Sequence, residues 1–220
     1  MPAPNHPGDS MEHGVEASHE HEQRLGGRLQ LLRPGDLLPA QQELYDHLLA
    51  TKLRWAEESK FQGQLADGRM IGPFNVFLQT PEMSRAFNDW VDAEAAHTSL
   101  AGDVRQVIVL AVGTAWDAAY EIYAHAAVGR QAGLSEATIQ SIIAGHKPDD
   151  LSPQAAAAYR FTDALARERS VDDALYAATV AALGTQGVAD MVNLIGIYLA
   201  TSALLNAFRI PVPRHGPPLP

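Results

Sequence analysis

The spacing of apolar residues predicts helices over most of the chain. In residues 39–59, Leu44, Leu48 and Leu53 recur at helical spacing behind Pro39, and a proline is tolerated in the first turn of a helix. No stretch alternates apolar and polar residues between hairpin turns, as a half-buried strand would. The pattern predicts an all-α domain over residues 31–210, with helices at 39–59, 72–78, 81–98, 103–114, a segment ending at 131, 135–145, 153–169, 171–183 and 185–208.

Polar side chains and prolines mark the expected helix starts. Thr80 precedes Pro81 and Ser152 precedes Pro153, which places a capping oxygen in front of a first-turn proline. The last predicted helix carries a large apolar face, so we expect it to close an interface between copies of the chain. The expected N-caps are Thr80, Ser135, Ser152 and either Thr114 or Asp117, and the apolar face comprises Val192, Ile195, Leu199, Leu204 and Leu205.

The two ends of the chain differ in composition from the domain between them. Residues 1–30 are polar, acidic and poor in large apolar side chains, which predicts a disordered tail. Four histidines in this tail allow a metal-binding interpretation, but their irregular spacing favours a solvated segment. Residues 211–220 are too rich in proline to continue a helix and predict an extended arm. The tail histidines are His6, His13, His19 and His21.

The chain has 220 residues and no cysteine. This length fits one domain that buries a core without covalent cross-links. The lack of thiols excludes disulfides, thiolate metal sites and a cysteine nucleophile. The 16 Lys and Arg residues stand against 26 Asp and Glu residues, a formal net charge of −10. Phosphate binding draws its affinity from clustered basic residues, so we expect no nucleic-acid partner.

Two apolar stretches, 107–119 and 191–205, are interrupted by polar residues. Both are shorter than the roughly 20 uninterrupted apolar residues of a membrane span. The first residues lack a basic segment followed by an apolar core, so we expect no secretory signal. The sequence predicts a cytoplasmic protein without a membrane partner. The interrupting residues are Asp117, Asn193, Thr201 and Ser202.

Glu121 and His125 are the strongest candidates for chemistry. Four residues apart on a predicted helix, they share one face among apolar neighbours, and their side chains can form a hydrogen bond. A carboxylate that holds one imidazole nitrogen leaves the other free as an acid or base near neutral pH. The alternative interpretation is a surface contact or a core histidine whose hydrogen bonds are satisfied. Spacing alone leaves both interpretations open.

Several short sequence motifs stand out along the helical region. Tyr120-Glu121, three residues and His125, followed by Gly133-Leu134-Ser135, form the most specific of them. On these motifs the chain resembles the carboxymuconolactone decarboxylase family, which has the alkylhydroperoxidase D-like fold, over residues 31–213, and within it a branch without cysteine. The other motifs are Gly72-Pro73-Phe74-Asn75 with Leu78 and Pro81, residues 104–112, Phe161-Thr162 and residues 188–198.

The resemblance implies an all-helical subunit that assembles into trimers or hexamers, with no metal or organic cofactor. In the peroxidase branch of this fold, two cysteines stand at the positions of Ala118 and Glu121, so thiol peroxidase activity is excluded here. Many family members carry a glutamate at the position of Gln106. Because an amide does not titrate, Gln106 is expected to orient water or substrate by hydrogen bonding.

The resemblance also implies a reaction. A decarboxylase without a cofactor needs a small unsaturated carboxylate or lactone that accepts electrons itself, while the protein holds the carboxylate and delivers a proton. We expect His125 to donate and accept the proton, with Glu121 as its partner or a second acid. A non-catalytic binding or assembly protein on the same scaffold is the alternative. The remaining pocket candidates are Tyr120, Tyr123, Trp116, Phe74, Asn75 and Gln106, with Arg105, Arg85 or Arg130 for the carboxylate.

Overall fold

The computed structural model describes residues 24–213, and this part of the chain is helical apart from loops, turns and one isolated bridge between Gln64 and Met70. The prediction of an all-helical domain is confirmed. In chain order the elements are the 3-10 turn η1 (Pro34–Asp36), α2 (Pro39–Leu48), the π-helical turn η2 (Leu49–Leu53), α3 (Arg54–Glu58), α4 (Pro73–Phe77), α5 (Pro81–His97), α6 (Gly102–Ala115), α7 (Ala119–Gln131), α8 (Glu136–Ile143), α9 (Pro153–Glu168) and α10 (Asp173–Ala207).

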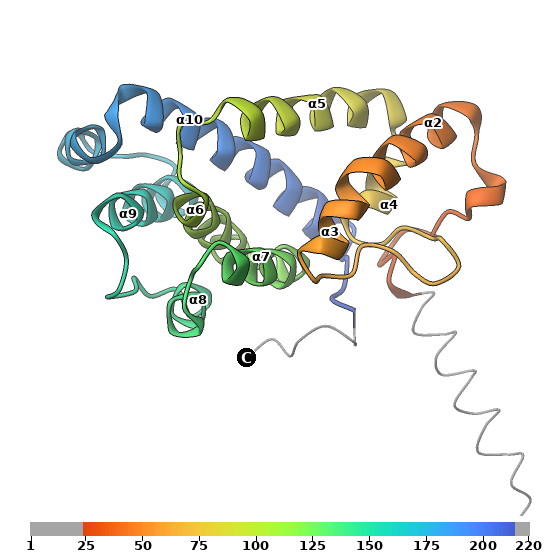
Figure 1. Ribbon diagram of the computed structural model, residues 1–220, viewed down its shortest axis with the longest axis horizontal. Helices are drawn as coiled ribbons and strands as arrows, with labels where there is room; N and C mark the ends of the chain where they lie inside the picture. The colour runs from red at the N-terminus through yellow and green to blue at the C-terminus, as the bar shows by residue number, and fades with distance from the viewer. Residues whose placement is uncertain (1–23, 214–220) are drawn as a thin grey trace, which may run out of the picture.

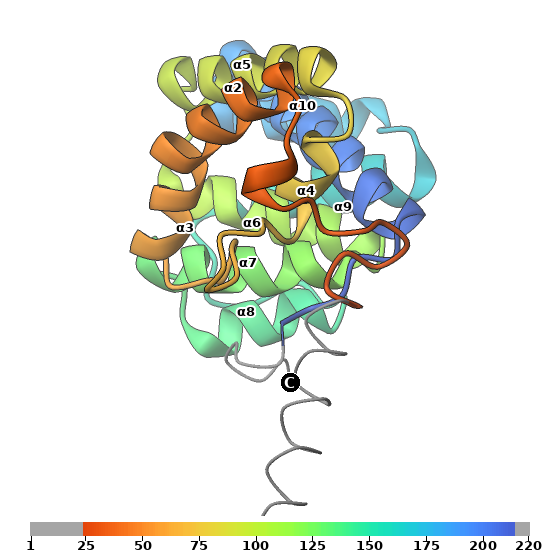
Figure 2. The same cartoon turned by 90° about the vertical axis from the view of Figure 1, so that its right-hand side faces the viewer.

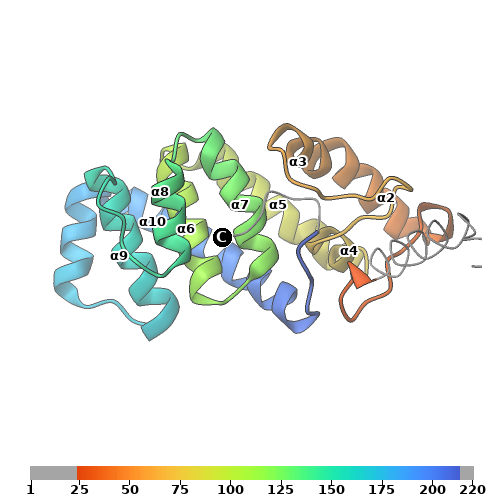
Figure 3. The ribbon, with the colours of Figure 1, turned by 90° about the horizontal axis from the view of Figure 1, so that it is seen from below.

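The helices form two regions that share their longest members. Figures 1 and 3 show α2, η2, α3 and α4 at one end of the molecule and α8 and α9 at the other, with α5 and α10 running between the two ends. Turned by 90°, the molecule shows α5 above and α8 below (Figure 2). We call the helices α2 to α4 with their loops the arm, and the helices α6 to α9 the bundle. Helix α6 is central to the bundle, since it packs against α7, α8, α9 and α10.

Each region has its own hydrophobic core. The bundle core is built on α6, where Val107, Ile108 and Leu110 are fully buried because apolar residues surround the helix on all sides. The arm core gathers residues from α2, α4 and the loop between α3 and α4, together with one face of α7. Its most buried members include Leu44, Leu48, Met70, Ile71, Leu78, Tyr120 and Tyr123.

Helix α10 is two helices joined at Gly184. This residue has φ +73° and ψ +168°, a non-helical conformation that interrupts the backbone hydrogen bonds of the helix. The sequence predicted a boundary at this position, between the helices 171–183 and 185–208. Within residues 24–213, α10 is the one helix long and apolar enough to cross a membrane by length and composition. Core helices pass the same test, and α10 packs against α6 and α9.

The expected N-caps are met at two helices and missed at two others. Ser135 and Ser152 accept hydrogen bonds from Thr138 N and Ala155 N, at 3.0 and 3.2 Å. Thr80 makes no such bond; its hydroxyl lies 3.3 Å from the Ser84 hydroxyl instead.

Helix α7 starts after Ala118 without a side-chain cap. Asp117, with φ +51°, ends α6 rather than starting α7. Asp117 N donates to Thr114 O and Ala118 N to Gly113 O, the bonding pattern of a Schellman C-cap.

Residues 24–30, which fall within the predicted disordered tail, contact the domain through Leu25, Gly27 and Arg28. Leu25 is 3% exposed, and Arg28 N donates to Phe208 O at 2.7 Å. Gly27, at φ +61°, lies so close to the C-terminal end of α10 that a Cβ would stand 2.2 Å from Phe208 O. Burial of Leu25 in the arm core stabilises this contact. One buried leucine has little effect on the average composition of residues 1–30, which is polar. We call the contact between residues 25–28 and residues 207–209 the terminal clasp. The four tail histidines and residues 214–220 lie outside the described range.

Some apolar side chains remain on the surface of the described chain. Trp90 on α5 is 40% exposed and Val192 on α10 is 43% exposed. Of the predicted interface face, Val192 is therefore solvent-accessible, whereas Ile195 and Leu205 are buried in the subunit core. Assembly into an oligomer stays a prediction.

Candidate functional site

A cavity of about 80 Å³ lies where the arm meets α5, α7 and α10. Its wall is mainly aromatic, a surface that excludes water and favours a small apolar ligand. Three ionisable side chains apart from tyrosines interrupt this wall: Lys52, Glu121 and His125. The aromatic members are Trp55, Phe61, Phe74, Phe77, Phe87, Tyr120 and Tyr198.

His125 is held in one orientation by three neighbours. Its Nδ1 lies 2.8 Å from Oε1 of Gln106, which comes from α6. Its ring packs edge-on against Tyr198 of α10, with centroids 4.8 Å apart, and lies 6.0 Å from the ring of Trp55. Because an amide oxygen can only accept, the Gln106 contact puts the proton on Nδ1 and leaves the Nε2 lone pair available to a ligand.

The imidazole is neutral over the physiological range. Burial removes water from the ring, and the nearby positive charge of Arg105 adds to this effect, so that the pKa of His125 falls to about 3. A neutral imidazole with Nδ1 protonated accepts a proton or a hydrogen bond at Nε2. Of the donor and acceptor roles expected of His125, this protonation state favours the acceptor role.

The pKa of Glu121 shifts in the opposite direction to that of His125. Its side chain is 2% exposed, one oxygen accepts from the Ser202 hydroxyl at 3.3 Å, and Oε2 is buried without a partner among the described residues. Burial raises the pKa of Glu121 well above its usual value, and the Ser202 hydrogen bond lowers it only in part. Burial therefore favours the protonated form of this carboxyl group. In that form the group can donate its proton into the cavity.

The predicted hydrogen bond between Glu121 and His125 is not formed. Both side chains reach the same cavity from α7, as their spacing of four predicts. Each side chain is hydrogen-bonded to a different helix, however. His125 bonds to Gln106 of α6, and Glu121 accepts from Ser202 of α10. The two groups line one space as separate polar groups, one an acid and one a base. Gln106 positions His125, where the sequence predicted that it would orient water or substrate.

Tyr120 and Phe74 are wall residues, as the sequence predicted. The Tyr120 hydroxyl donates to Gln62 O at 2.6 Å, and its ring covers Gly72. Tyr123, by contrast, does not line the cavity. Its hydroxyl accepts from Gln62 N at 2.9 Å, so this side chain ties α7 to the arm.

Trp116, Asn75 and Arg105 lie outside the cavity lining, contrary to expectation. Trp116 is the C-cap residue of α6, and its side chain is 37% exposed. Arg105 Nη1 binds Glu94 Oε1 at 2.5 Å, which commits the guanidinium to an ion pair. Arg85 and Arg130 do not line the cavity either, and Arg130 pairs with Glu136 on the surface.

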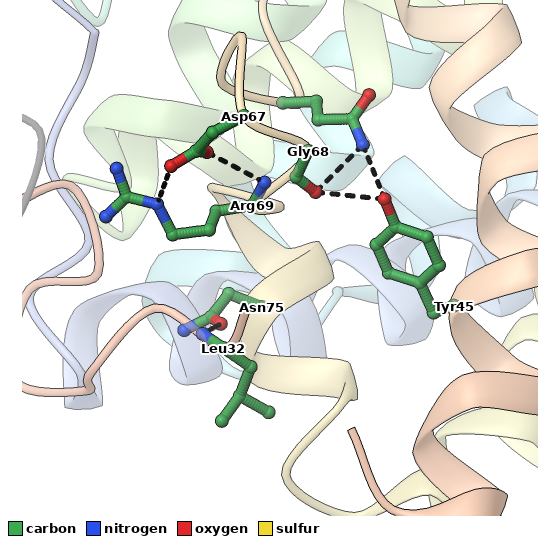
Figure 4. A network of polar contacts seen from close by, with 7 residues as sticks. Leu32, Tyr45, Asp67, Gly68, Arg69 and Asn75 are labelled. Carbon is green, nitrogen blue, oxygen red and sulfur yellow. Dashed lines mark hydrogen bonds and ion pairs between the residues drawn. The ribbon is translucent and has the colours of Figure 1, made fainter. Parts of the chain in front are cut away.

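Asn75 is buried in the arm, where it holds the chain before η1. Its Oδ1 accepts from Leu32 N at 3.0 Å, and its Nδ2 donates to Gln30 O. Figure 4 shows this contact beside the turn at Gly68, whose carbonyl accepts from the Tyr45 hydroxyl. These bonds tie α4 to the segment before η1 and tie α2 to the turn at Gly68.

Several residues of the site were not predicted from the sequence, among them Lys52, Trp55 and Ser202. Lys52 and Trp55 stand three apart on η2 and α3, a spacing that places both on one face, but nothing in the local pattern marks that face as a cavity wall. Ser202 is invisible as a partner of Glu121 because the two are 81 residues apart. Within residues 24–213, no three His, Asp or Glu side chains form a group able to hold a metal ion.

Comparison with known proteins identifies the fold and a family match over part of the chain. Residues 81–164 match the model of the carboxymuconolactone decarboxylase family, a stretch that includes Gln106, Glu121 and His125. No curated protein matches the chain. The match covers less than half of the 220 residues.

Several solved structures share the fold at low sequence identity. An uncharacterised peroxidase-related protein from Ralstonia eutropha, an alkylhydroperoxidase AhpD core, is 16% identical with a TM-score of 0.66, covering 85% of this chain and 92% of its own. A second peroxidase-related protein, from Silicibacter, is 15% identical with a TM-score of 0.67, covering 87% and 94%. A cysteine-to-alanine variant of the debrominase Bmp8, in complex with 2,3,4-tribromopyrrole, is 14% identical with a TM-score of 0.59, covering 75% and 87%. The chain therefore has the all-helical AhpD-like fold.

Proposed function

We propose that the chain is an acid/base enzyme of the carboxymuconolactone decarboxylase type, acting on a small unsaturated carboxylate or lactone without a cofactor. One observation carries the proposal: Glu121, a buried carboxyl whose pKa is raised, and His125, an imidazole whose pKa is lowered, line the same apolar cavity. Oppositely perturbed pKa values in one cavity are typical of acid and base roles. The family match over residues 81–164 supports the same reaction class.

Glu121 is the proton source in this mechanism. In a decarboxylation, the bond to the carboxylate carbon breaks and its electron pair moves into the conjugated carbonyl of the substrate. Glu121 then gives its proton to the reacting carbon and regains one from water, so that the turnover releases carbon dioxide and consumes one proton. The buried Oε2 has no partner within the described chain and is free for this contact.

His125 is the proton acceptor. With Nδ1 held by Gln106, Nε2 accepts a hydrogen bond from the substrate or takes a proton from it, and in an isomerisation Glu121 returns a proton at another carbon. Because Gln106 carries no charge, the imidazolium formed in this step gains no carboxylate partner there. Substrate negative charge in the cavity is what would stabilise it.

Purified protein incubated with γ-carboxymuconolactone, followed by its ultraviolet absorbance, tests the proposal. Glu121→Gln and His125→Ala are each expected to lower kcat by about 100-fold or more, the usual contribution of a positioned acid or base. Glu136→Gln makes the same change on the surface and should leave kcat unchanged. Turnover retained in both cavity variants would refute the assigned roles. No turnover by the unmodified protein would reject this substrate.

A binding protein on the same scaffold is the second candidate. It is favoured by Gln106, an amide that cannot titrate, which makes the hydrogen bond to His125. Solvent proton exchange separates the two functions. An acid/base enzyme should introduce deuterium from D2O into a bound unsaturated lactone, and Glu121→Gln should abolish the exchange. A binding protein would hold the lactone without exchange in either form.

A further inference from the structure

We propose that Lys52 binds a carboxylate of the ligand that does not react, and thereby restricts the cavity to anions with an apolar unsaturated body. This inference rests on the proposed function for the identity of the reacting groups. Its own basis is the placement of Lys52, which lines the cavity three residues before Trp55. It assigns to the arm the carboxylate-binding role that we expected of an arginine.

Lys52 is the one lysine or arginine of the cavity wall within the described residues. Burial raises the pKa of Glu121 and lowers the pKa of His125, so it disfavours the charged form of both neighbours. Arg105 lies near enough for its charge to lower the pKa of His125, but Glu94 pairs with it and offsets that charge. A cavity with low-dielectric walls and one sign of charge favours an ion of the opposite sign.

The partner of Lys52 is well placed to be replaced. The ammonium pairs with Asp92 of α5, a residue that is not part of the cavity lining. The Lys52 side chain is 14% exposed, whereas that of Asp92 is 47% exposed. An ion pair with a solvated carboxylate is weak, about 1 kcal/mol or less, so a carboxylate inside the apolar cavity can compete for the ammonium.

The local backbone supports a specific placement of this ammonium. Lys52 lies in the π-helical turn η2, between α2 and α3. A π-turn inserts one residue into a helix and shifts the faces on either side, and such turns are common at functional sites. Here Lys52 and Trp55 reach the same cavity across the end of that turn.

The chemistry of decarboxylation decides which carboxylate Lys52 holds. A cation beside the leaving carboxylate stabilises a charge that the transition state loses, and this slows the reaction. A cation beside a carboxylate that keeps its charge contributes binding alone. The ligand therefore has an unsaturated body that reaches Glu121 and His125 and a separate carboxylate at Lys52.

Isothermal titration calorimetry with 2-furoate and its neutral analogue 2-furamide tests the assignment. The full-length protein should bind 2-furoate more tightly than 2-furamide. Lys52→Met should weaken 2-furoate binding about 10- to 100-fold, the effect of losing a charged hydrogen bond, and leave 2-furamide within twofold. Lys147→Met removes an equal charge from an exposed loop and should change neither affinity.

Two further variants keep the test decisive if Lys52→Met folds poorly. Lys52→Arg should retain the preference for 2-furoate, and Asp92→Asn should strengthen 2-furoate binding by removing the competing carboxylate. Equal loss of both ligands in Lys52→Met, an unchanged affinity in Asp92→Asn, or no 2-furoate binding to the unmodified protein would overturn the assignment. Because Glu121→Gln should still bind 2-furoate, loss of turnover and loss of anion preference are separable.

Discussion

The bundle and the arm contribute different things to the cavity. The bundle supplies the groups that can move or hold a proton, since Gln106 lies on α6 and both Glu121 and His125 lie on α7. The arm supplies walls and charge through Lys52, Trp55 and Phe74 among others. The family match covers the first set and stops short of the second. The matched stretch therefore contains the groups to which we assign proton transfer, while Lys52, Trp55 and Phe74 of the cavity wall lie outside it.

The two regions meet closely at Gly72 and Tyr120. Gly72 has φ +65° and ψ −146°, a conformation that side chains rarely adopt, and a Cβ there would stand 2.2 Å from the Tyr120 ring. Tyr120 in turn donates to Gln62 O. This contact sets how the arm closes over α7.

Gly72→Ala should have the largest effect, because it breaks this contact and strains the backbone at once. We expect a loss of about 3 kcal/mol or more in the free energy of unfolding, measured by urea denaturation. Gly133→Ala is the matched control, since Gly133 also has positive φ, +93°, but open space around it. It should lose only about 1 kcal/mol. Equal losses at both positions would mean that the Tyr120 contact contributes nothing.

Glu121 should make the protein less stable as pH rises. Its folded-state pKa is raised, so the folded chain keeps a proton that the unfolded chain releases above about pH 4.5. Between that pH and the raised pKa, the free energy of unfolding should fall by about 1.4 kcal/mol per pH unit relative to Glu121→Gln. Urea denaturation of both proteins from pH 5 to pH 8 measures this difference.

His125 should act in the opposite direction over a different range. Its pKa falls to about 3 in the folded chain, so the unfolded chain binds more protons between pH 3 and pH 6.5. Stability should therefore decrease as pH falls through this window, and His125→Gln should remove that dependence. Parallel curves for the variant and the unmodified protein in either window would contradict the assigned protonation state.

Trp116→Ala should have the smallest effect on the cavity. Trp116 lies at the end of α6 and outside the lining, so 2-furoate affinity should stay within about twofold, as for a surface change. Trp55→Ala removes an aromatic wall beside His125 and should weaken binding about tenfold or more. Comparable losses in the two variants would place Trp116 at the ligand after all.

Local patterns predicted the helices well because each helix is specified by its own residues. The break at Gly184 and the caps at Ser135 and Ser152 were readable from single positions. The packing of Leu25 was not, because it depends on residues at the far end of the chain. Asp117 was misread because a left-handed C-cap and an N-cap favour the same side chain.

The candidate site was only partly predictable for the same reason. The spacing of four between Glu121 and His125 correctly predicted one shared face. Their actual partners, Ser202 and Gln106, are 81 and 19 residues away and follow from helix packing. Lys52 lies in a helical turn whose π geometry no periodicity indicates. The resemblance supplied candidates on α6 and α7 and Phe74 in the arm, whereas Lys52 and Trp55 required the three-dimensional structure.

The terminal clasp has a consequence for how the molecule folds. The Arg28 guanidinium donates to Ala207 O across a sequence separation of 179 residues, so this contact closes nearly the whole described chain into a loop. The entropy of closing a loop grows only slowly with length, about 0.6 kcal/mol per doubling, but contacts of high sequence separation form late. The bundle can therefore assemble first from near neighbours, and a circular permutant that joins Arg28 to Ala207 through a linker should keep the cavity intact.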